Sequence, residues 1–269
     1  HRDQALAELG AQVSREELLG AYDAVIYATG ANEDLRLGIP GEELLGSTSA
    51  REFVAWYGGH PDARAYDLVG VRTAAAIGMG NVAVDVARLL VKNPTDLEWT
   101  DMPGSVLEAL HASTVRDVYI IGRRGPQHGA FTVKELRELC TLPGVQVSVS
   151  EEAFEGIDET SLDRRCRANV ETLRAAAARS VPEPRARLHF EFWRRPVEVL
   201  GDTRVSGLLL ERTRWEDGRV VGTGRFETIP LQLVLRAIGY RSDPLPGVSF
   251  DLKRGIVPNV EGRVTTVKG

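Results

Sequence analysis

The sequence has little cysteine, and its cysteines are not arranged to bind a metal or to cross-link a fold. Cys140 and Cys166 form neither a Cys-x-x-Cys pair nor a spacing typical of metal ligands. This indicates a reducing compartment without a disulfide framework. The histidines His60, His111 and His189 are isolated, so we expect no metal site.

Long apolar runs and excess positive charge are also missing. No stretch approaches the roughly 18 consecutive apolar residues of a membrane span. The first residues, HRDQALAELG, lack the apolar core of a signal peptide, so we expect a cytoplasmic protein. A net charge of −5 and a pI near 5.7 argue against a general binder of nucleic acid or anionic membranes. Any basic site must therefore be a local cluster.

The length is sufficient for one large or two modest domains. The chain has 269 residues, of which 43% are hydrophobic and 26% charged, as in an ordinary globular protein. It begins without methionine and ends at VTTVKG with no closing element, so we expect a fragment of a longer protein.

Two distant segments share one form: an apolar strand followed by a small residue, glycine and a loop. They are YDAVIYATGA at 22–31 and LQLVLRAIGY at 231–240. Alternating strands and helices lie between them, which predicts an α/β fold. We predict a dinucleotide-binding domain at 35–230, inserted into a second domain made of 1–34 and 231–269.

The intervening elements follow from local patterns. Ser14-x-x-Glu17 is a capping box that predicts a short helix, and REFVAWY predicts another. VRTAAAIG, RDVYIIGRRG and VQVSVS are expected strands, the first unusually rich in alanine. From about residue 186, RLHFEFW, RVSGLLLERT and RFETIPL predict further strands, including a short antiparallel section with an Asp217-Gly218 turn.

The motif Gly78-x-Gly80-x-x-Ala83 follows a predicted strand and opens a helix. In a dinucleotide-binding fold the first glycine permits the tight turn, and the second lets a pyrophosphate approach the backbone. The small third residue lets helix and strand pack closely. The helix N-terminus adds free N–H groups and partial positive charge. The alternative is a purely structural tight turn.

The helix after this motif is predicted to be buried on most sides. Its polar residues Asn81, Asp85, Arg88 and Lys92 recur at spacings of four, three and four, which describes one polar stripe. The helix should end before Asn93-Pro94.

The end of the next strand indicates which dinucleotide binds. NAD-binding units usually place a carboxylate there, whereas this strand is followed by Arg123 and Arg124. Two guanidinium groups suit a 2′-phosphate, and each charge-assisted contact contributes about 1.5 to 3 kcal/mol. We therefore favour NADP over a solvated basic turn.

Thr132-Val133-Lys134-Glu135 leaves two interpretations open. Thr-x-x-Glu is a capping box, in which Glu135 would satisfy a backbone N–H. Alternatively the helix start faces the cofactor, with Glu135 contacting it and Glu138 nearer the reacting ring.

A basic cluster stands out in this acidic chain. Arg164, Arg165 and Arg167 are followed by Arg174 and Arg179. The cluster is either a solvated helix face or a docking patch for an acidic partner.

Together these segments resemble a known family. IGMGNVAVDVARLL, IIGRRGPQHGAFTVKELREL, GIVPNVEGRV and the ATGA…GIPGEE pair make the chain similar to the adrenodoxin reductase-like ferredoxin-NADP reductases, over nearly its whole length. The resemblance implies a flavoprotein whose Rossmann-like NADP-binding domain, here 35–230, is inserted into an FAD-binding domain, of which 1–34 and 231–269 would be incomplete parts. It also implies hydride transfer from NADPH to FAD, followed by release of single electrons to a ferredoxin or similar acidic iron-sulfur carrier.

The resemblance also assigns residues. It places Asn81, Val82, Ala83 and Val84 along the pyrophosphate and the approach to the nicotinamide, after Gly78 and Gly80. It gives the 2′-phosphate to Arg123 and Arg124, a contact with NADP to Glu135, and a position near the flavin edge to Glu138. Arg164, Arg165 and Arg167 fall where mammalian-type members carry basic residues that meet an acidic ferredoxin.

The chain departs from the family in three places. The FAD-binding GxGxxG strand and the C-terminal GWxKRGPTG-like segment are absent, and Gln127-His128-Gly129 replaces the usual Leu-Gln after GRRGP. We therefore expect this polypeptide to bind NADP better than FAD.

Two other functions are alternatives to a ferredoxin reductase. The chain could be a stand-alone NADP-binding module without turnover, or the NADPH-flavin module of a larger amidotransferase or pyrimidine-reducing enzyme. The latter typically has iron-sulfur cysteines that this chain lacks.

Overall fold

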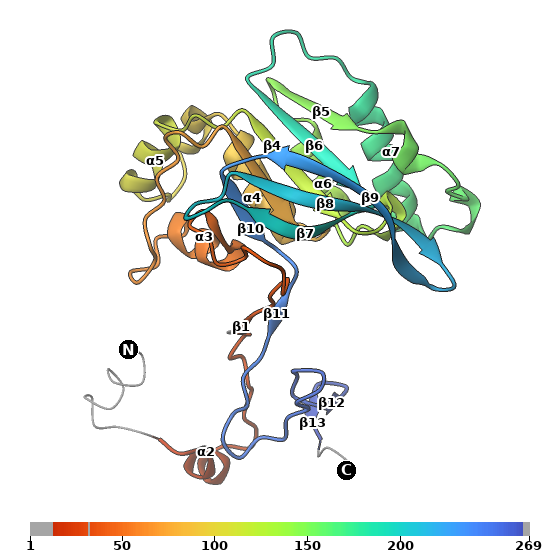
Figure 1. Ribbon diagram of the computed structural model, residues 1–269. Helices are drawn as coiled ribbons and strands as arrows, with labels where there is room; N and C mark the ends of the chain where they lie inside the picture. The colour runs from red at the N-terminus through yellow and green to blue at the C-terminus, as the bar shows by residue number, and fades with distance from the viewer. Residues whose placement is uncertain (1–12, 32, 266–269) are drawn as a thin grey trace. The chain divides into compact units, whose positions relative to one another are not determined.

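The computed structural model of the chain describes residues 13–31 and 33–265. These residues divide into a central unit, Arg36–Ile238, and an outer unit formed by the chain on either side of it. Figure 1 shows the elements of both units. No helix among the described ranges is both long and apolar enough to cross a membrane.

A parallel six-stranded sheet forms the middle of the central unit. The strand order is β2-β10-β3-β4-β6-β5, and every neighbouring pair is parallel. Parallel pairing requires crossover connections, which agrees with the predicted α/β class. The strands are β2 (Ser47–Ser49), β10 (Leu233–Arg236), β3 (Thr73–Ile77), β4 (Asp117–Gly122), β6 (Ala186–Phe192) and β5 (Val145–Val149).

Helices pack on one face of this sheet and a second sheet packs on the other (Figure 1). Alternate residues of β3 show the division: Ala74 and Ala76 belong to the helix-side core, whereas Ala75 and Ile77 belong to the core under the second sheet. The helices are α3 (Ala50–Tyr57), α4 (Asn81–Val91), α5 (Gly104–His111), α6 (Val133–Cys140) and α7 (Arg164–Ala178). The 3-10 turns are η1 (Pro94–Leu97), η2 (Pro126–His128), η3 (Glu151–Phe154) and η4 (Glu159–Ser161).

The second sheet is the antiparallel section that the sequence predicts. It consists of β7 (Arg194–Leu200), β8 (Gly207–Glu216) and β9 (Arg219–Pro230). Asp217 and Gly218 join β8 to β9 with φ values of 49° and 77°, as a hairpin turn of the predicted type requires. RLHFEFW forms β6, which lies in the parallel sheet.

The predicted end of the inserted domain needs correction. We placed 231–269 in the outer domain, but β10 lies between β2 and β3 in the central sheet, and the central unit extends to Ile238. The apolar run LVLR is buried on both faces there, with Leu233, Val234 and Leu235 all at most 4% exposed. Burial on both faces is expected of a central strand in a parallel sheet.

The outer unit contains α2 (Arg15–Ala21), β12 (Asn259–Val260), β13 (Arg263–Val264) and a two-stranded ribbon. The ribbon pairs β1 (Glu33–Asp34) with β11 (Tyr240–Arg241) in antiparallel orientation. These strands adjoin the two points at which the chain passes from one unit to the other. The Ser14 capping box is confirmed, since Ser14 accepts from the N–H of Glu17 and Glu17 accepts from the N–H of Ser14.

The strand predicted at YDAVIYATGA is wrong for the described structure. Residues 24–31 form no strand, and Ile26 is 89% exposed. A strand exists only where a neighbour takes up its backbone hydrogen bonds, and the described part of the chain pairs no strand with this segment. The local strand propensity of this segment was therefore not enough to form a strand without a pairing partner.

Candidate dinucleotide site

The glycine motif lies at the carboxyl edge of the parallel sheet, between β3 and α4. Gly78 has a φ of 143°, and a Cβ there would overlap the carbonyl oxygen of Ala237. A side chain at Gly78 would therefore be strained and crowded. Ligands of open parallel sheets bind at this edge, which makes the turn the natural candidate site.

Gly80 has a different environment. It is the extended N-cap residue of α4, no side chain caps the helix there, and a Cβ would meet no atom within 4 Å. Ala83, fully buried one turn later, packs the helix closely against the sheet. The start of α4 thus presents N–H groups and partial positive charge to open space, which is how helix N-termini bind phosphate.

Gly122 holds this turn against the end of β4. A Cβ at Gly122 would overlap the side chain of Met79, and Ala130 donates its N–H to the carbonyl of Met79 at 2.7 Å. We did not identify this role from the sequence. The signal was present, since a glycine at a strand end often marks close approach of another backbone segment.

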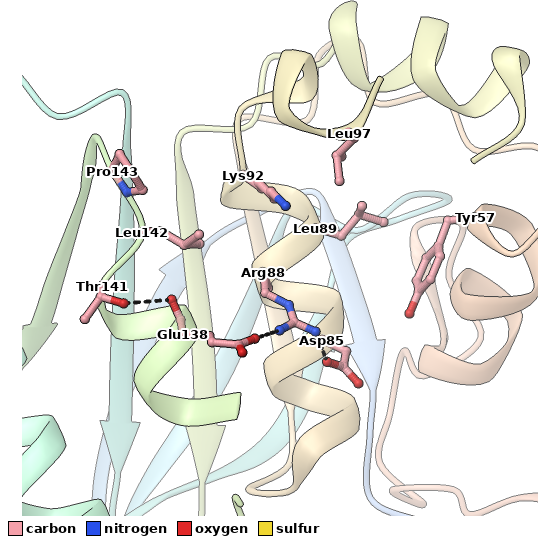
Figure 2. A pocket seen from close by; sticks show the side chains of 10 residues that line it. All are labelled: Tyr57, Asp85, Arg88, Leu89, Lys92, Leu97, Glu138, Thr141, Leu142 and Pro143. Atoms are coloured by element: carbon pink, nitrogen blue, oxygen red, sulfur yellow. Dashed lines mark hydrogen bonds and ion pairs between the residues drawn. The ribbon is translucent and has the colours of Figure 1, made fainter. Parts of the chain in front are cut away.

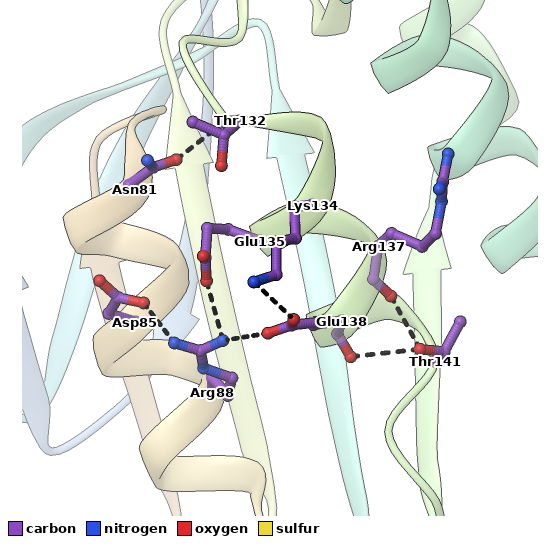
Figure 3. Close-up of polar contacts among 9 residues, drawn as sticks. All are labelled: Asn81, Asp85, Arg88, Thr132, Lys134, Glu135, Arg137, Glu138 and Thr141. Carbon is purple, nitrogen blue, oxygen red and sulfur yellow. Dashed lines mark hydrogen bonds and ion pairs between the residues drawn. The ribbon is translucent and has the colours of Figure 1, made fainter.

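Of the two interpretations of Thr132-Val133-Lys134-Glu135, the capping box is not formed. Thr132 is the N-cap of α6, but its side chain makes no capping hydrogen bond. Its N–H instead donates to Oδ1 of Asn81 at 2.8 Å (Figure 3). The first residue of α4 therefore ties the glycine turn to the start of α6.

Glu135 and Glu138 both bind Arg88. One guanidinium nitrogen of Arg88, Nη1, lies 2.9 Å from a carboxylate oxygen of each glutamate, and Nη2 lies 2.7 Å from Oδ1 of Asp85. Figure 3 shows how the three carboxylates surround Arg88. Lys134 approaches Glu138 at 4.0 Å. The structure thus brings together the two predicted cofactor-contacting carboxylates, and a residue of the polar stripe holds them.

Burial and charge oppose each other at Asp85. Desolvation is the largest effect and raises the pKa of the Asp85 carboxyl; Arg88 lowers it, and Glu135 and Glu138 raise it. The net shift is upward, because desolvation, together with the charges of Glu135 and Glu138, outweighs the attraction of Arg88. From the sequence we placed Arg88 only on the polar stripe of the helix. Its contacts with α6 depend on tertiary packing.

A cavity of about 560 Å³ opens beside this cluster (Figure 2). It lies near the C-terminal half of α4, whereas the glycine turn is at the N-terminus of that helix. The cavity is therefore separate from the expected pyrophosphate position. Its lining residues are Tyr57, Asp85, Arg88, Leu89, Lys92, Leu97, Glu138, Thr141, Leu142 and Pro143.

Arg123 and Arg124 follow β4 with a fixed backbone and exposed side chains. The Thr213 hydroxyl donates to the carbonyl of Arg123 at 2.8 Å, and the N–H of Trp193 donates to that of Arg124 at 3.3 Å. Ile77 of β3 pairs with Ile121 of β4, so the arginines lie at the strand end next to the glycine turn. Their binding of a 2′-phosphate stays a prediction.

The arginine cluster at the start of α7 separates into two kinds. Arg167 is directed at backbone carbonyls, with its Nε 3.1 Å from the oxygen of Glu159. Arg174 pairs with Glu159 at 3.2 Å and lies over the ring of Phe154. Arg164, Arg165 and Arg167 are all exposed at the N-terminal end of the helix. Among the described residues, Arg164 and Arg165 donate to no backbone carbonyl, so their guanidinium groups are more open to a partner than that of Arg167.

Comparison with known proteins gives a consistent result. No model of a protein family matches the chain. The chain is 43% identical to NADPH-ferredoxin reductase FprA of Mycobacterium tuberculosis over 266 residues, and 43% identical to the mitochondrial NADPH:adrenodoxin oxidoreductase of Arabidopsis thaliana over 278 residues. The corresponding Bos taurus protein is 43% identical over 282 residues. These alignments cover 95%, 96% and 97% of the chain, but only 58%, 58% and 57% of the relatives.

A solved structure, that of Mycobacterium tuberculosis FprA in complex with NADPH, superimposes with a TM-score of 0.86 at 42% identity. The match covers 94% of this chain and 57% of that one. Sequence and fold therefore agree along nearly all of the chain. Over the length that it spans, the chain belongs to the family of adrenodoxin reductase-like ferredoxin-NADP reductases.

Proposed function

We propose that the protein carrying this chain transfers electrons from NADPH, through FAD, to a ferredoxin-type iron-sulfur carrier. In this scheme the chain supplies mainly the NADP-binding part. The observation that carries the proposal is the open glycine turn at the start of α4, beside two exposed arginines on the neighbouring strand end. The similarity to NADPH-ferredoxin reductases supports it.

The residues at this edge suit NADP in charge and in space. The pyrophosphate would lie over Gly80, where no atom approaches, with N–H groups of the first helical turn directed at it. Arg123 and Arg124 would hold the 2′-phosphate, and their fixed backbone limits the entropy lost on binding. When bound, the reduced nicotinamide supplies a hydride.

Glu135 and Glu138 would have complementary roles. We assign Glu135 a contact with NADP and Glu138 a place near the flavin edge of the intact protein. Because both accept from Arg88, their charges are partly offset where an anionic dinucleotide would approach. Arg88 would thus position both carboxylates and reduce their repulsion of the phosphates.

FAD belongs to this proposal through the family resemblance. Apart from Glu138, we assign it no residue of this chain. A preparation that contains stoichiometric FAD would contradict our expectation that this polypeptide carries little flavin.

The partner surface would be the exposed start of α7. We propose that Arg164 and Arg165, with Arg167 beside them, meet an acidic carrier. Reversing the charges of Arg164 and Arg165 should slow reduction of ferredoxin by the intact protein and leave reduction of a dye unchanged. If the charge-reversed variant and the wild type reduce ferredoxin at equal rates, the patch is only a solvated helix face.

We further propose a cytoplasmic location, which rests on the sequence. Both cysteines are free thiols, and burial raises the pKa of the Cys140 thiol to about 12, which keeps it protonated and poorly reactive. The similar plant and bovine proteins are mitochondrial, so fractionation of the source cells tests the assignment.

Calorimetric titration with NADP and NAD tests the central proposal. We expect preferential binding of NADP by a protein without flavin absorbance between roughly 350 and 500 nm. Binding of neither nucleotide would overturn the proposal. Reduction of a dye by NADPH would separate a reductase module from the alternative, a stand-alone NADP-binding module.

A further inference from the structure

One peptide group in the loop before α6 is held from both sides by asparagine side chains. The carbonyl of Phe131 accepts a hydrogen bond from Nδ2 of Asn169, a residue of α7, at 3.0 Å. The N–H of the same peptide, which belongs to Thr132, donates to Oδ1 of Asn81, the first residue of α4, at 2.8 Å (Figure 3). Side chains of α4 and α7 therefore meet at one planar group, directly before α6.

Asn169 is the less expected member of this pair. It is 0% exposed, and its Oδ1 has no hydrogen-bond partner among the described residues. A buried acceptor without a partner costs stability, which an apolar side chain of similar size would avoid. The hydrogen bond from Nδ2 to the Phe131 carbonyl is thus the contact that explains an asparagine at this position.

The held peptide lies next to the helix that carries the predicted cofactor contacts. Thr132 is the N-cap of α6, and Glu135 lies in the first turn of that helix. Ala130 makes a further connection, because its N–H donates to the carbonyl of Met79 in the glycine turn at 2.7 Å. The side chain of Thr132 does not cap α6, so the position of the helix start depends on contacts from outside the helix.

The contacts between α4 and α6 occur at two levels. Asn81 bonds to the loop at the start of α6, and further along α4 Arg88 pairs with Glu135 and Glu138. Ion pairs between partly exposed side chains constrain geometry weakly, whereas a peptide that is bonded at both its donor and its acceptor is fixed in direction. Hydrogen bonds in a chain also polarise one another, so each asparagine strengthens the bond that the other makes.

We propose that Asn169 and Asn81 are positioning residues of the dinucleotide site. By holding one peptide they fix the start of α6, and with it Glu135, against the glycine turn. The inference rests on the proposed NADP site and adds to it a fully buried residue, Asn169, which acts on a ligand only through the peptide that it holds. The part of NADP near the glycine turn depends on this arrangement, and the 2′-phosphate at Arg123 and Arg124 does not.

Two probes separate positioning from general damage. NADP spans the glycine turn and the two arginines, whereas adenosine 2′-monophosphate offers only the group that the arginines hold. Calorimetry on the full 269-residue chain should show that Asn169→Ala weakens NADP binding roughly tenfold and leaves binding of the monophosphate nearly unchanged. Equal weakening of both probes, or of neither, would overturn the proposal.

Two variants are controls for the substitution itself. Val170→Ala truncates the next residue of α7, which is also 0% exposed, and should lower the stability while both probes bind as they do to the wild type. Asn93→Ala removes an asparagine that likewise accepts a backbone N–H, that of Thr95 at the start of η1, and should also leave both probes unaffected. Selective loss of NADP binding in Val170→Ala would show that the held peptide is not the cause.

Hydrogen exchange of the Thr132 amide tests the arrangement without a ligand and with the buried asparagine in place. Asn81→Ala should speed exchange at this amide roughly tenfold, and Asn81→Asp, whose carboxylate can accept the same hydrogen bond, should keep it slow. Asn169→Ala should also speed it, because the bond to the Phe131 carbonyl strengthens the N–H bond on the other side. Exchange at the wild-type rate in Asn81→Ala would overturn the proposal even if Asn169→Ala does not fold.

The outcomes separate this inference from the proposed function. If the wild type, Asn169→Ala and Asn81→Ala all bind NADP equally well, the two asparagines do not position the site, and the NADP site stands. If the wild type does not bind NADP, both proposals fail.

Discussion

Two sets of arginines in the central unit differ in what surrounds their charged groups. Arg88 is 28% exposed and makes ion pairs with three carboxylates from α4 and α6. Arg123 and Arg124 extend from a fixed backbone into solvent, and no ion pair between described residues uses their side chains. The first arrangement stabilises helix packing, whereas the second leaves charge available for a ligand.

The two glycines of the motif show the same difference. Gly78 is crowded by Ala237, and Gly80 borders open space. Crowding identifies a position that the fold requires, and open space identifies one that a ligand can use. Stability and binding measurements therefore distinguish the two kinds of position.

The largest expected effect is at the glycines. Gly78→Ala should lower the free energy of unfolding by about 3 kcal/mol, because it adds a positive-φ strain and an overlap with a backbone carbonyl. Gly80→Ala, at a φ of −120°, should leave the stability nearly unchanged and still weaken NADP binding. Denaturant unfolding and calorimetry measure the two effects; equal stability losses would remove the distinction.

Next in size is the change at the exposed arginines. Arg123→Ala combined with Arg124→Ala should weaken NADP binding by roughly tenfold to a hundredfold and affect NAD little, since only NADP carries the 2′-phosphate. Arg187, exposed near the opposite end of the parallel sheet, offers a control in Arg187→Ala. Equal losses for both nucleotides would contradict the 2′-phosphate assignment.

A smaller effect is expected at Arg88. Arg88→Met should cost about 1 kcal/mol of stability at pH 7, because the partly exposed carboxylates lose their shared counter-charge. The pKa of Asp85 is already raised, and removing Arg88 raises it further. In the variant, the Asp85 carboxyl then binds a proton more tightly in the folded than in the unfolded state. The loss of stability relative to the wild type should therefore shrink as the pH falls toward about 4.

Unfolding of Arg88→Met at several pH values checks this prediction. Lys92→Met, at the C-cap of α4, is the control, since Lys92 is not in the ion-pair cluster of Figure 3. A loss that stays constant with pH would show that packing, not charge, explains the effect.

The smallest effect distinguishes the arginines at the start of α7. Arg167→Ala should lower the stability by about 0.5 kcal/mol, because its guanidinium donates to carbonyls of the preceding segment. Arg164→Ala and Arg165→Ala should leave the melting temperature unchanged, since neither side chain donates to a backbone carbonyl of a described residue. A loss of equal size at all three positions would show that they do not differ in role.

Local patterns predicted much of the central unit. The polar stripe of α4 has the predicted partial exposure at Asn81, Asp85, Arg88 and Lys92, and the helix ends before Asn93-Pro94. The Asp217-Gly218 turn and the Ser14 cap also formed as predicted. These features depend on residues within one or two turns of each other, so adjacent sequence carries the information.

Non-local partners explain the predictions that failed. The segment YDAVIYATGA has strand propensity but pairs with no described strand. At Thr132, where the sequence left two interpretations open, the backbone N–H donates to Asn81. The position of β10 between β2 and β3 likewise depends on strands that are distant in sequence. Which strands pair depends on contacts across the whole sheet, and those contacts join residues that are distant in the sequence.

By itself, the sequence determined the α/β class, the glycine turn, the two arginines beside it and the family resemblance, because each is encoded in a short run of residues. Only the tertiary structure decided that Arg88 joins Glu135 to Glu138, and that His128 stacks on Trp215. Those contacts join residues of separate elements. Their distances depend on how helices and strands pack, which no local pattern specifies.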